Sequence, residues 1–104
     1  MNNIVLRNIY YAIQNQLLIE FNYENEGTRL IEPFCVGRAN SGNYLVRGFQ
    51  RQGYTQSNMP AWKLFDLKKV SNMKILTDNF NPKDRKEYNM NDKVMDIIFM
   101  QIEY

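Results

Sequence analysis

Residues 17–33 read LLIEFNYENEGTRLIEP, and this stretch decides the fold. In its first seven residues, Ile19, Phe21 and Tyr23 alternate with Glu20 and Asn22, which places the apolar side chains on one face of a half-buried strand. The polar run ENEG (24–27) has the composition of a tight turn, and TRLIE (28–32) predicts a returning strand. The proline that follows lacks an N–H for a ladder, so it indicates an edge or a bend. The stretch therefore predicts an antiparallel hairpin.

The residues on either side of the hairpin predict one helix and several more strands. A helix is expected from about residue 3 to residue 15, capped by Asn2 or Asn3, because apolar residues recur at helical spacing: Ile4, Leu6, Ile9, Tyr10, Ile13 and Leu17. Beyond the hairpin we expect strands over 34–38, 44–49, 62–67 and 73–76. A turn over 40–43 and a long polar loop over 50–60 separate them.

The tail after Phe80 differs in composition from the preceding strands. Residues 83–88 are charged and predict one helical turn, and residues 89–92 predict a loop. Ile98, Met100, Ile102 and Tyr104 then alternate, which favours a strand packed on the barrel, with a helix as the alternative reading. If the apolar run does not close the sheet, it forms a surface for self-association.

These elements predict a single domain over 1–104. Its fold class is mainly β with an N-terminal helix, as a small SH3-like or Sm-like antiparallel barrel, because several short strands follow each other at close spacing. The helix spans about 3–15, the barrel about 17–80, and the C-terminal extension 81–104.

Several short motifs, in their order and spacing, resemble those of the WYL domain, a Sm/SH3-like β module that binds ligands or nucleic acid. They are Ala12-Ile13, Phe21-Asn22-Tyr23, Gly27, Arg29, Pro33, Gly42-Asn43-Tyr44-Leu45, Lys63-Leu64-Phe65 and Lys69-Val70. The resemblance covers about residues 9–80 and implies a stand-alone, divergent member. Typical members carry an N-terminal helix-turn-helix, which we do not expect here.

Four positions depart from the family pattern. Asn43 stands where the family has tryptophan, Lys63 and Lys69 stand where it has arginine, and Lys68 replaces an acidic residue. Lysine keeps the charge of arginine but lacks its planar, two-pronged grip on phosphate or carboxylate.

The composition argues against catalysis. The chain has no histidine and one cysteine, so zinc enzymes and Ser/His or Cys/His nucleophiles are excluded, and we expect no metal and no cofactor. The carboxylate pairs Asp92/Asp96 and Glu24/Glu26 have no third partner in the sequence. We therefore expect a protein that is not an enzyme.

Cellular context is read from the cysteine and from the apolar runs. Cys35 lies in an apolar stretch, which predicts a buried, inert thiol. The sequence has no secretory signal and no run long enough to span a membrane, so we expect a cytoplasmic protein without a membrane partner.

Charge is unevenly distributed along the chain. Residues 38–74 hold seven basic residues and one acid, Asp66, so this segment carries +6; because the whole chain carries +2, the rest carries −4. A local positive field attracts anions whatever the total charge is. The alternative is a solvated β surface whose counter-charges come from elsewhere in the fold.

The candidate binding residues come mainly from this segment. If the strands are ordered as in the family, the resemblance brings together a first set of cations and an aromatic ring: Arg29, Tyr44, Arg47, Lys63 and Lys69. Further stacking or loop contacts are expected from Arg51, Tyr54 and Trp62. Trp62 and Phe65 fall on opposite faces of one strand, with Phe65 in the core and Trp62 available to a base or a partner.

Cations beside an aromatic face suit a nucleotide, since charge holds phosphate while a ring stacks a base. The sequence thus predicts a non-enzymatic, regulatory binding module for single-stranded nucleic acid or a nucleotide-like anionic ligand. The alternative is a protein-interaction or assembly protein, of phage or mobile-element type, that acts through homo-oligomerisation or a separate protein partner.

Overall fold

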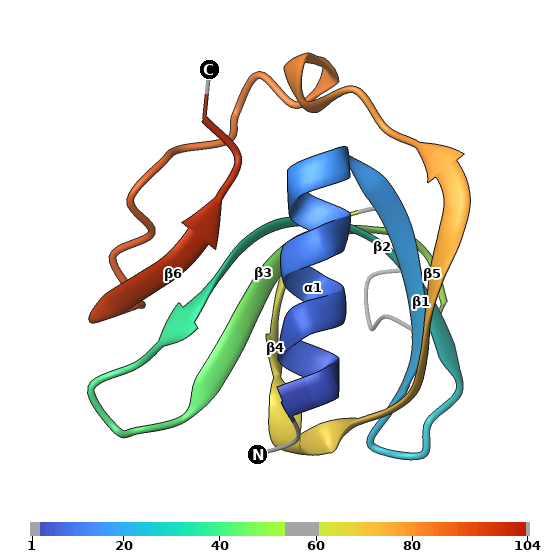
Figure 1. Cartoon of the computed structure of the whole chain (residues 1–104), viewed down its shortest axis with the longest axis horizontal. Helices are drawn as coiled ribbons and strands as arrows, with labels where there is room; N and C mark the ends of the chain where they lie inside the picture. Colours follow the sequence, from blue (N-terminus) through green and yellow to red (C-terminus); the bar gives the residue numbers. More distant parts are fainter. Residues whose placement is uncertain (1–2, 54–60, 104) are drawn as a thin grey trace.

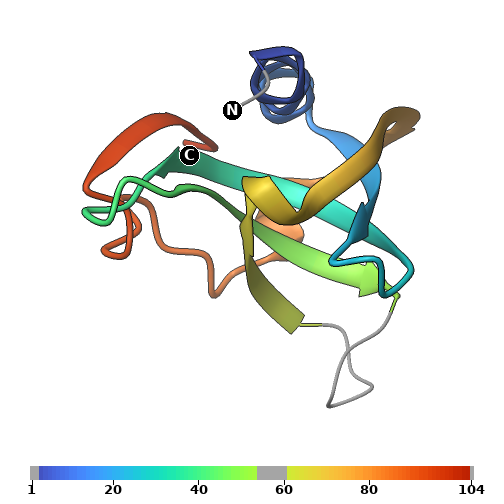
Figure 2. The ribbon, with the colours of Figure 1, turned by 90° about the horizontal axis from the view of Figure 1, so that it is seen from below.

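The computed structural model describes residues 3–53 and 61–103. Its one long helix, α1 (Asn3–Asn15), has the predicted bounds and buries an apolar face made of Ile9, Ala12 and Ile13. The helix stops at Gln16, whose φ of 56° lies in the left-handed region and turns the chain into the first strand. In Figure 1, α1 lies across the curled sheet, and Figure 2 shows it end-on.

Six strands form one antiparallel sheet. They are β1 (Leu17–Tyr23), β2 (Thr28–Arg38), β3 (Tyr44–Gln52), β4 (Ala61–Asp66), β5 (Val70–Asn79) and β6 (Ile97–Gln101). The order across the sheet is β4-β3-β2-β1-β5, and β6 also pairs with β2. The predicted fold class is confirmed: the chain is mainly β, with one N-terminal helix and an antiparallel sheet.

The long strand β2 organises this sheet. One of its edges pairs with β3 from Leu30 to Arg38. The other edge is shared: β1 pairs with it as far as Ile31, and β6 pairs with it from Cys35 onward. Pro33 lies between the two partners, where a residue without an N–H costs the ladder least. The sheet therefore bends where its edge passes from β1 to β6.

The core lies between α1 and the inner face of the sheet. Phe21 of β1 packs edge-on against Phe65 of β4, with ring centroids 5.1 Å apart, and Tyr23 packs against the same ring at 4.9 Å. Phe65 is buried, as its place in the strand predicted. These contacts join β1 and β4, which are not neighbours in the sheet, across its curved inner face. The aromatic residues of β1 therefore form part of the core together with Phe65.

Several predicted bounds were wrong. β2 runs through Pro33 as one strand, and β3 continues to Gln52, so residues 50–52 are not part of the loop; Gln50 is in fact buried. β5 begins at Val70, directly after the 3₁₀ turn η1 (Leu67–Lys69), and is longer than the predicted 73–76. The predicted helical turn in the tail is the shorter 3₁₀ turn η2 (Pro82–Asp84).

Gly37 allows β6 to approach β2. A Cβ atom at this position would meet the Ile97 carbonyl oxygen well inside van der Waals contact, and it would also crowd the Met95 sulfur. We expect Gly37→Ala to lower the free energy of unfolding by about 1–3 kcal/mol, as overpacking in a core does. Urea unfolding measures the loss, and amide hydrogen exchange locates it.

Exchange is expected to quicken mainly in β6. Thr77→Ala, on an exposed part of β5, is the control and should leave both measurements near the wild type. Wild-type protection of β6 in Gly37→Ala would show that the close approach is not needed for the pairing.

Candidate functional site

The outer face of β3 and β4 is covered by residues 80–96, called here the C-terminal segment. Side chains alternate along β3, so Tyr44 points toward β6 and packs on Phe99, whereas Arg47 points to the other face and meets Asp92 of this segment. The segment contains η2, which is capped by the Asn81 side chain, and it ends where β6 starts. Figure 1 shows it in orange between β5 and β6.

A buried carboxylate fastens the first part of this segment. Glu32 of β2 is only 1% exposed, and its oxygens accept hydrogen bonds from Arg51 at 2.6 Å and from Arg85 at 2.7 and 3.0 Å. The guanidinium of Arg85 also lies 3.8 Å from the centre of the Phe49 ring. The Glu32 hydrogen bond is the main reason that the pKa of Arg85 is raised. One carboxylate thus ties β2, β3 and the C-terminal segment together.

A second ion pair fastens the segment further along. Arg47 Nε donates to Asp92 Oδ2 at 2.6 Å, and Arg47 Nη2 lies 3.5 Å from Oδ1. The Asp92 side chain also accepts from the Val94 amide at 3.0 Å, so it caps a turn. Burial alone would raise the pKa of Asp92, but the hydrogen bonds from Arg47 and Val94, together with the arginine charge, hold it below its ordinary value.

An aromatic cluster lies between these two ion pairs. Trp62 of β4 stacks on Tyr88 with centroids 5.9 Å apart and planes 24° apart, and Phe34 packs on both rings at 4.7 Å. The Trp62 indole N–H donates to Glu87 at 2.9 Å, and the Tyr88 hydroxyl donates to the Ile102 carbonyl at 3.0 Å. A backbone hydrogen bond and the indole N–H lower the pKa of Glu87.

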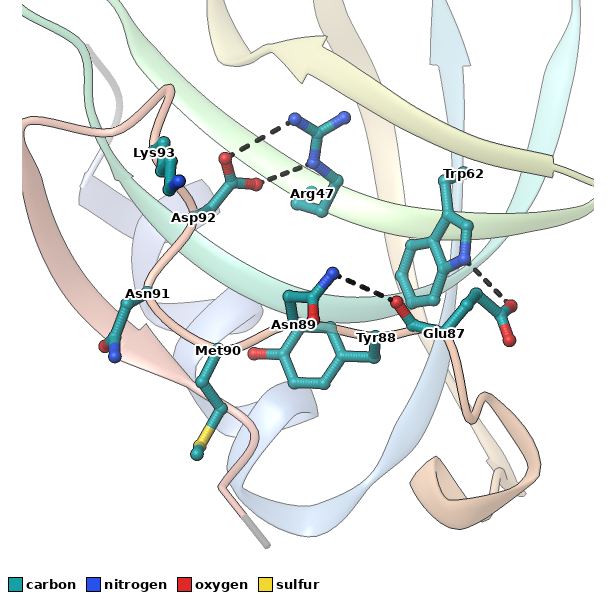
Figure 3. Close-up of a pocket in the computed structure, with 9 residues that line it drawn as sticks. All are labelled: Arg47, Trp62, Glu87, Tyr88, Asn89, Met90, Asn91, Asp92 and Lys93. Atoms are coloured by element: carbon teal, nitrogen blue, oxygen red, sulfur yellow. Dashed lines mark hydrogen bonds and ion pairs between the residues drawn. The ribbon is translucent and has the colours of Figure 1, made fainter.

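Between β3, β4 and the C-terminal segment lies a pocket of about 740 Å³. Its wall from the sheet is Arg47 and Trp62, and its other wall is the run Glu87 to Lys93 (Figure 3). Arg47 and Lys93 bring two positive charges, while Glu87 and Asp92 bring two negative charges. The pocket therefore combines aromatic rings, amide groups and a balanced set of charges.

The structure places two of the predicted residues, Arg47 and Trp62, in this pocket. It does not bring all five residues of the first predicted set into one place. Tyr44 lies on the opposite face of β3, and Lys69 pairs with Glu24 beside the first hairpin, at 3.7 Å. The predicted convergence failed because strand alternation separates Tyr44 from Arg47.

The remaining predicted residues lie elsewhere. Arg29 is 7% exposed, donates to Gln50 at 3.4 Å and lies 5.4 Å from the Tyr23 ring centre. Lys63 pairs in register with Gly48, on the face of β4 opposite Trp62. Arg51 is bound to Glu32, and Tyr54 lies outside the described residues.

Acids from outside the basic segment neutralise part of its charge. Arg47 pairs with Asp92, Arg51 with Glu32 and Lys69 with Glu24. For these three cations, counter-charges from elsewhere in the fold are therefore the outcome. Three of the seven cations of this segment are thus paired with acids within the described residues.

The residues that sequence reasoning missed lie mainly in the C-terminal segment. Tyr88, Glu87 and Arg85 carried no recognisable motif, and Asp92 was weighed only as a partner of Asp96 in catalysis. Glu32 gave one signal: a carboxylate between Ile31 and Pro33 in a strand needs a partner if it is buried. Burial of Cys35 is confirmed, and desolvation raises its pKa to about 12, followed in weight by the charge of Asp92.

Within the described residues, no group of three or more acidic or cysteine side chains is placed to hold a metal ion. Nor does any helix in this part of the chain have the length and apolar character needed to cross a membrane.

The fold is similar to part of a solved structure, that of Proteasome accessory factor B/C (PafBC) of Arthrobacter aurescens. The TM-score is 0.62 and the sequence identity 19%, over 81% of this chain and 14% of that chain. The present chain thus corresponds to about a seventh of PafBC. No protein-family model and no curated protein matches the sequence. The likeness concerns the fold alone and supports, at a distance, a WYL-like fold.

Replacement of Glu32 tests the buried fastening of the segment. We expect Glu32→Gln to lower the free energy of unfolding by about 2–3 kcal/mol, because two arginines lose a charged partner that is itself buried. Glu26→Gln, in an exposed turn, is the matched control. Urea denaturation measures both, and equal stability of the two variants would contradict the assigned role of Glu32.

Because the pKa of Asp92 is lowered in the folded protein, the stability that its carboxylate contributes depends on pH. A carboxyl whose pKa is lower in the folded state stabilises the fold above its unfolded pKa, and this contribution disappears as the pH falls through the folded pKa. We therefore expect Asp92→Asn to cost about 1 kcal/mol at neutral pH and little in acid. Unfolding curves from neutral to acidic pH measure the difference in stability between Asp92→Asn and the wild type, with Asp78→Asn as a control for net charge. A gap that persists in acid would be inconsistent with an ionic contribution.

Proposed function

We propose that this chain is a non-catalytic, regulatory binding module of WYL-like fold, and that its ligand is nucleotide-like: a planar ring that carries an anionic group. The observation that carries the proposal is the presence of Arg47 and Trp62 in the same pocket. The pocket volume of about 740 Å³ lies in the range of small-molecule sites.

Each half of such a ligand has a matching group. Arginine binds phosphate through a planar fork of N–H donors, and Lys93 at the rim adds a second cation. Trp62 and Tyr88 supply aromatic surface, and stacking of one base on an aromatic ring contributes about 1–3 kcal/mol. The Asn89 side-chain amide, which donates to the Glu87 carbonyl oxygen at 3.4 Å, also has an oxygen that can accept from the edge of a base.

A small ligand fits these observations better than a long single strand. Long strands are held by a continuous row of cations along the backbone. Here Arg47, Arg51 and Lys69 are each paired with an acid, and they lie in different parts of the surface. Of the two ligands predicted from the sequence, the nucleotide-like ligand is therefore preferred to single-stranded nucleic acid, and an oligonucleotide becomes a comparison ligand.

Trp62 is the only tryptophan of the chain, so its fluorescence reports directly on the pocket. We expect saturable quenching by nucleoside phosphates, with an affinity that falls as salt is added. Arg47→Lys should weaken binding about tenfold, because lysine keeps the charge but loses the fork. Arg38→Lys, on β2 and outside the pocket, is the matched control and should bind like the wild type.

Two results would contradict this function. The first is the absence of any saturable change in Trp62 fluorescence with nucleoside phosphates, and the second is tighter binding of an oligonucleotide that does not affect Trp62. A molar mass that rises with concentration, in protein that binds no nucleotide, would instead favour self-association, for which Met90, Val94 and Ile97 are exposed.

A further inference from the structure

We infer that Asp92 is a built-in competitor for the anion site of this pocket: its carboxylate occupies the position on Arg47 that a ligand phosphate would take. The inference rests on the proposed function and adds to it the class of ligand that can enter. A bound anion must displace Asp92, so the pocket selects a group with more negative charge than a single carboxylate.

The first support is the geometry of the ion pair. Asp92 presents both of its oxygens to Arg47, one at 2.6 Å from Nε and one at 3.5 Å from Nη2. Phosphate uses the same two-pronged arrangement on arginine. The carboxylate therefore stands in the place of two phosphate oxygens, at the wall of a pocket that also contains Trp62 (Figure 3).

The second support is that Asp92 can leave without detaching the segment. The segment is anchored on one side by Tyr88, which packs on Trp62 and Phe34, and on the other by the buried Met95, whose sulfur accepts from Cys35 at 3.5 Å. Between these anchors, Asp92 is the one described residue that is not exposed. Asn91 is also tied to Gln101 by hydrogen bonds of 2.8 and 3.1 Å, so a rotation of the Asp92 side chain, rather than a shift of the loop, would open Arg47 while these contacts stay in place.

The contrast with Glu32 strengthens this point. Glu32 is held by two arginines and is 1% exposed, whereas Asp92 is held by one arginine and is 11% exposed, with its partner at 25%. Water can therefore replace the lost contacts of Asp92 much more easily than those of Glu32. Of these two ion pairs that fasten the segment, the one at the pocket is the one that can exchange.

The third support is the charge balance. While Asp92 is in place, the charges of Arg47 and Lys93 are offset by those of Glu87 and Asp92, so these four side chains sum to zero charge. Once the Asp92 carboxylate has rotated away, the phosphate binds Arg47. A phosphate monoester carries nearly two negative charges at neutral pH, against one for a carboxylate or a phosphodiester. The preferred ligand class is therefore a terminal phosphate monoester.

The test removes the charge of Asp92 and keeps its shape. Asp92→Asn retains a side-chain oxygen for the Val94 amide, so the turn is preserved. Inorganic phosphate is the probe, followed by the ¹⁵N–¹H signal of Arg47 Nε. We expect phosphate to bind this variant at least tenfold more tightly than the wild type, and Asp78→Asn, which makes the same change in net charge on β5, to bind like the wild type.

Equal phosphate affinity of Asp92→Asn, Asp78→Asn and the wild type would overturn the inference. If nucleotides still quench Trp62 in that case, the proposed function stands without it; if they do not, both fail. Tighter phosphate binding without any nucleotide effect on Trp62 would support the anion site and contradict the stacking half of the function. Should Asp92→Asn unfold, Asp92→Ser serves the same purpose, since a serine hydroxyl also caps a turn.

Discussion

The sheet depends on β2, because this strand must satisfy three partners with two edges. It pairs with β3 along nearly its whole length, and its second edge serves β1 first and β6 afterwards. The Ile102 amide donates to the Phe34 carbonyl at 2.8 Å just past Pro33, so the new partner begins directly after the residue that has no N–H. A strand that ended at Pro33 would leave β6 without a place in the sheet.

The pocket follows from that arrangement. Since β5 lies at one edge of the sheet and β6 pairs with the far half of β2, the chain between them has to cross the molecule. It crosses the outer face of β3 and β4 as the C-terminal segment, and Arg85, Tyr88 and Asp92 fasten it there. The crossing leaves a hollow above Arg47 and Trp62. The site is thus a consequence of topology, built from residues far apart in the chain.

This origin explains what the sequence could predict. The helix, the existence of the strands and the opposite faces of Phe65 and Trp62 follow from local periodicity, whereas the bounds of β2, β3 and β5 did not. Arg47 was a candidate because of the family resemblance, and Trp62 because it lies on the strand face opposite Phe65. Their partners were not recognised, because Asp92 is 45 residues from Arg47 and Glu87 is 25 residues from Trp62. No local pattern links such residues; only the path of the C-terminal segment does.

The long-range ion pairs also determine which cations of the basic segment, residues 38–74, are available to a ligand. A count of charges along the chain treats each cation as available, yet an arginine that is partly buried in a fold is stable only with a partner. The acids that pair with these arginines differ in burial: Glu32 is almost completely buried, whereas Asp92 lies at the pocket and is partly exposed to water. An arginine that pairs with a buried carboxylate such as Glu32 stabilises the structure. An arginine whose partner is partly exposed, such as Arg47, can exchange that partner for another anion, and this property makes a structural ion pair usable as a binding site.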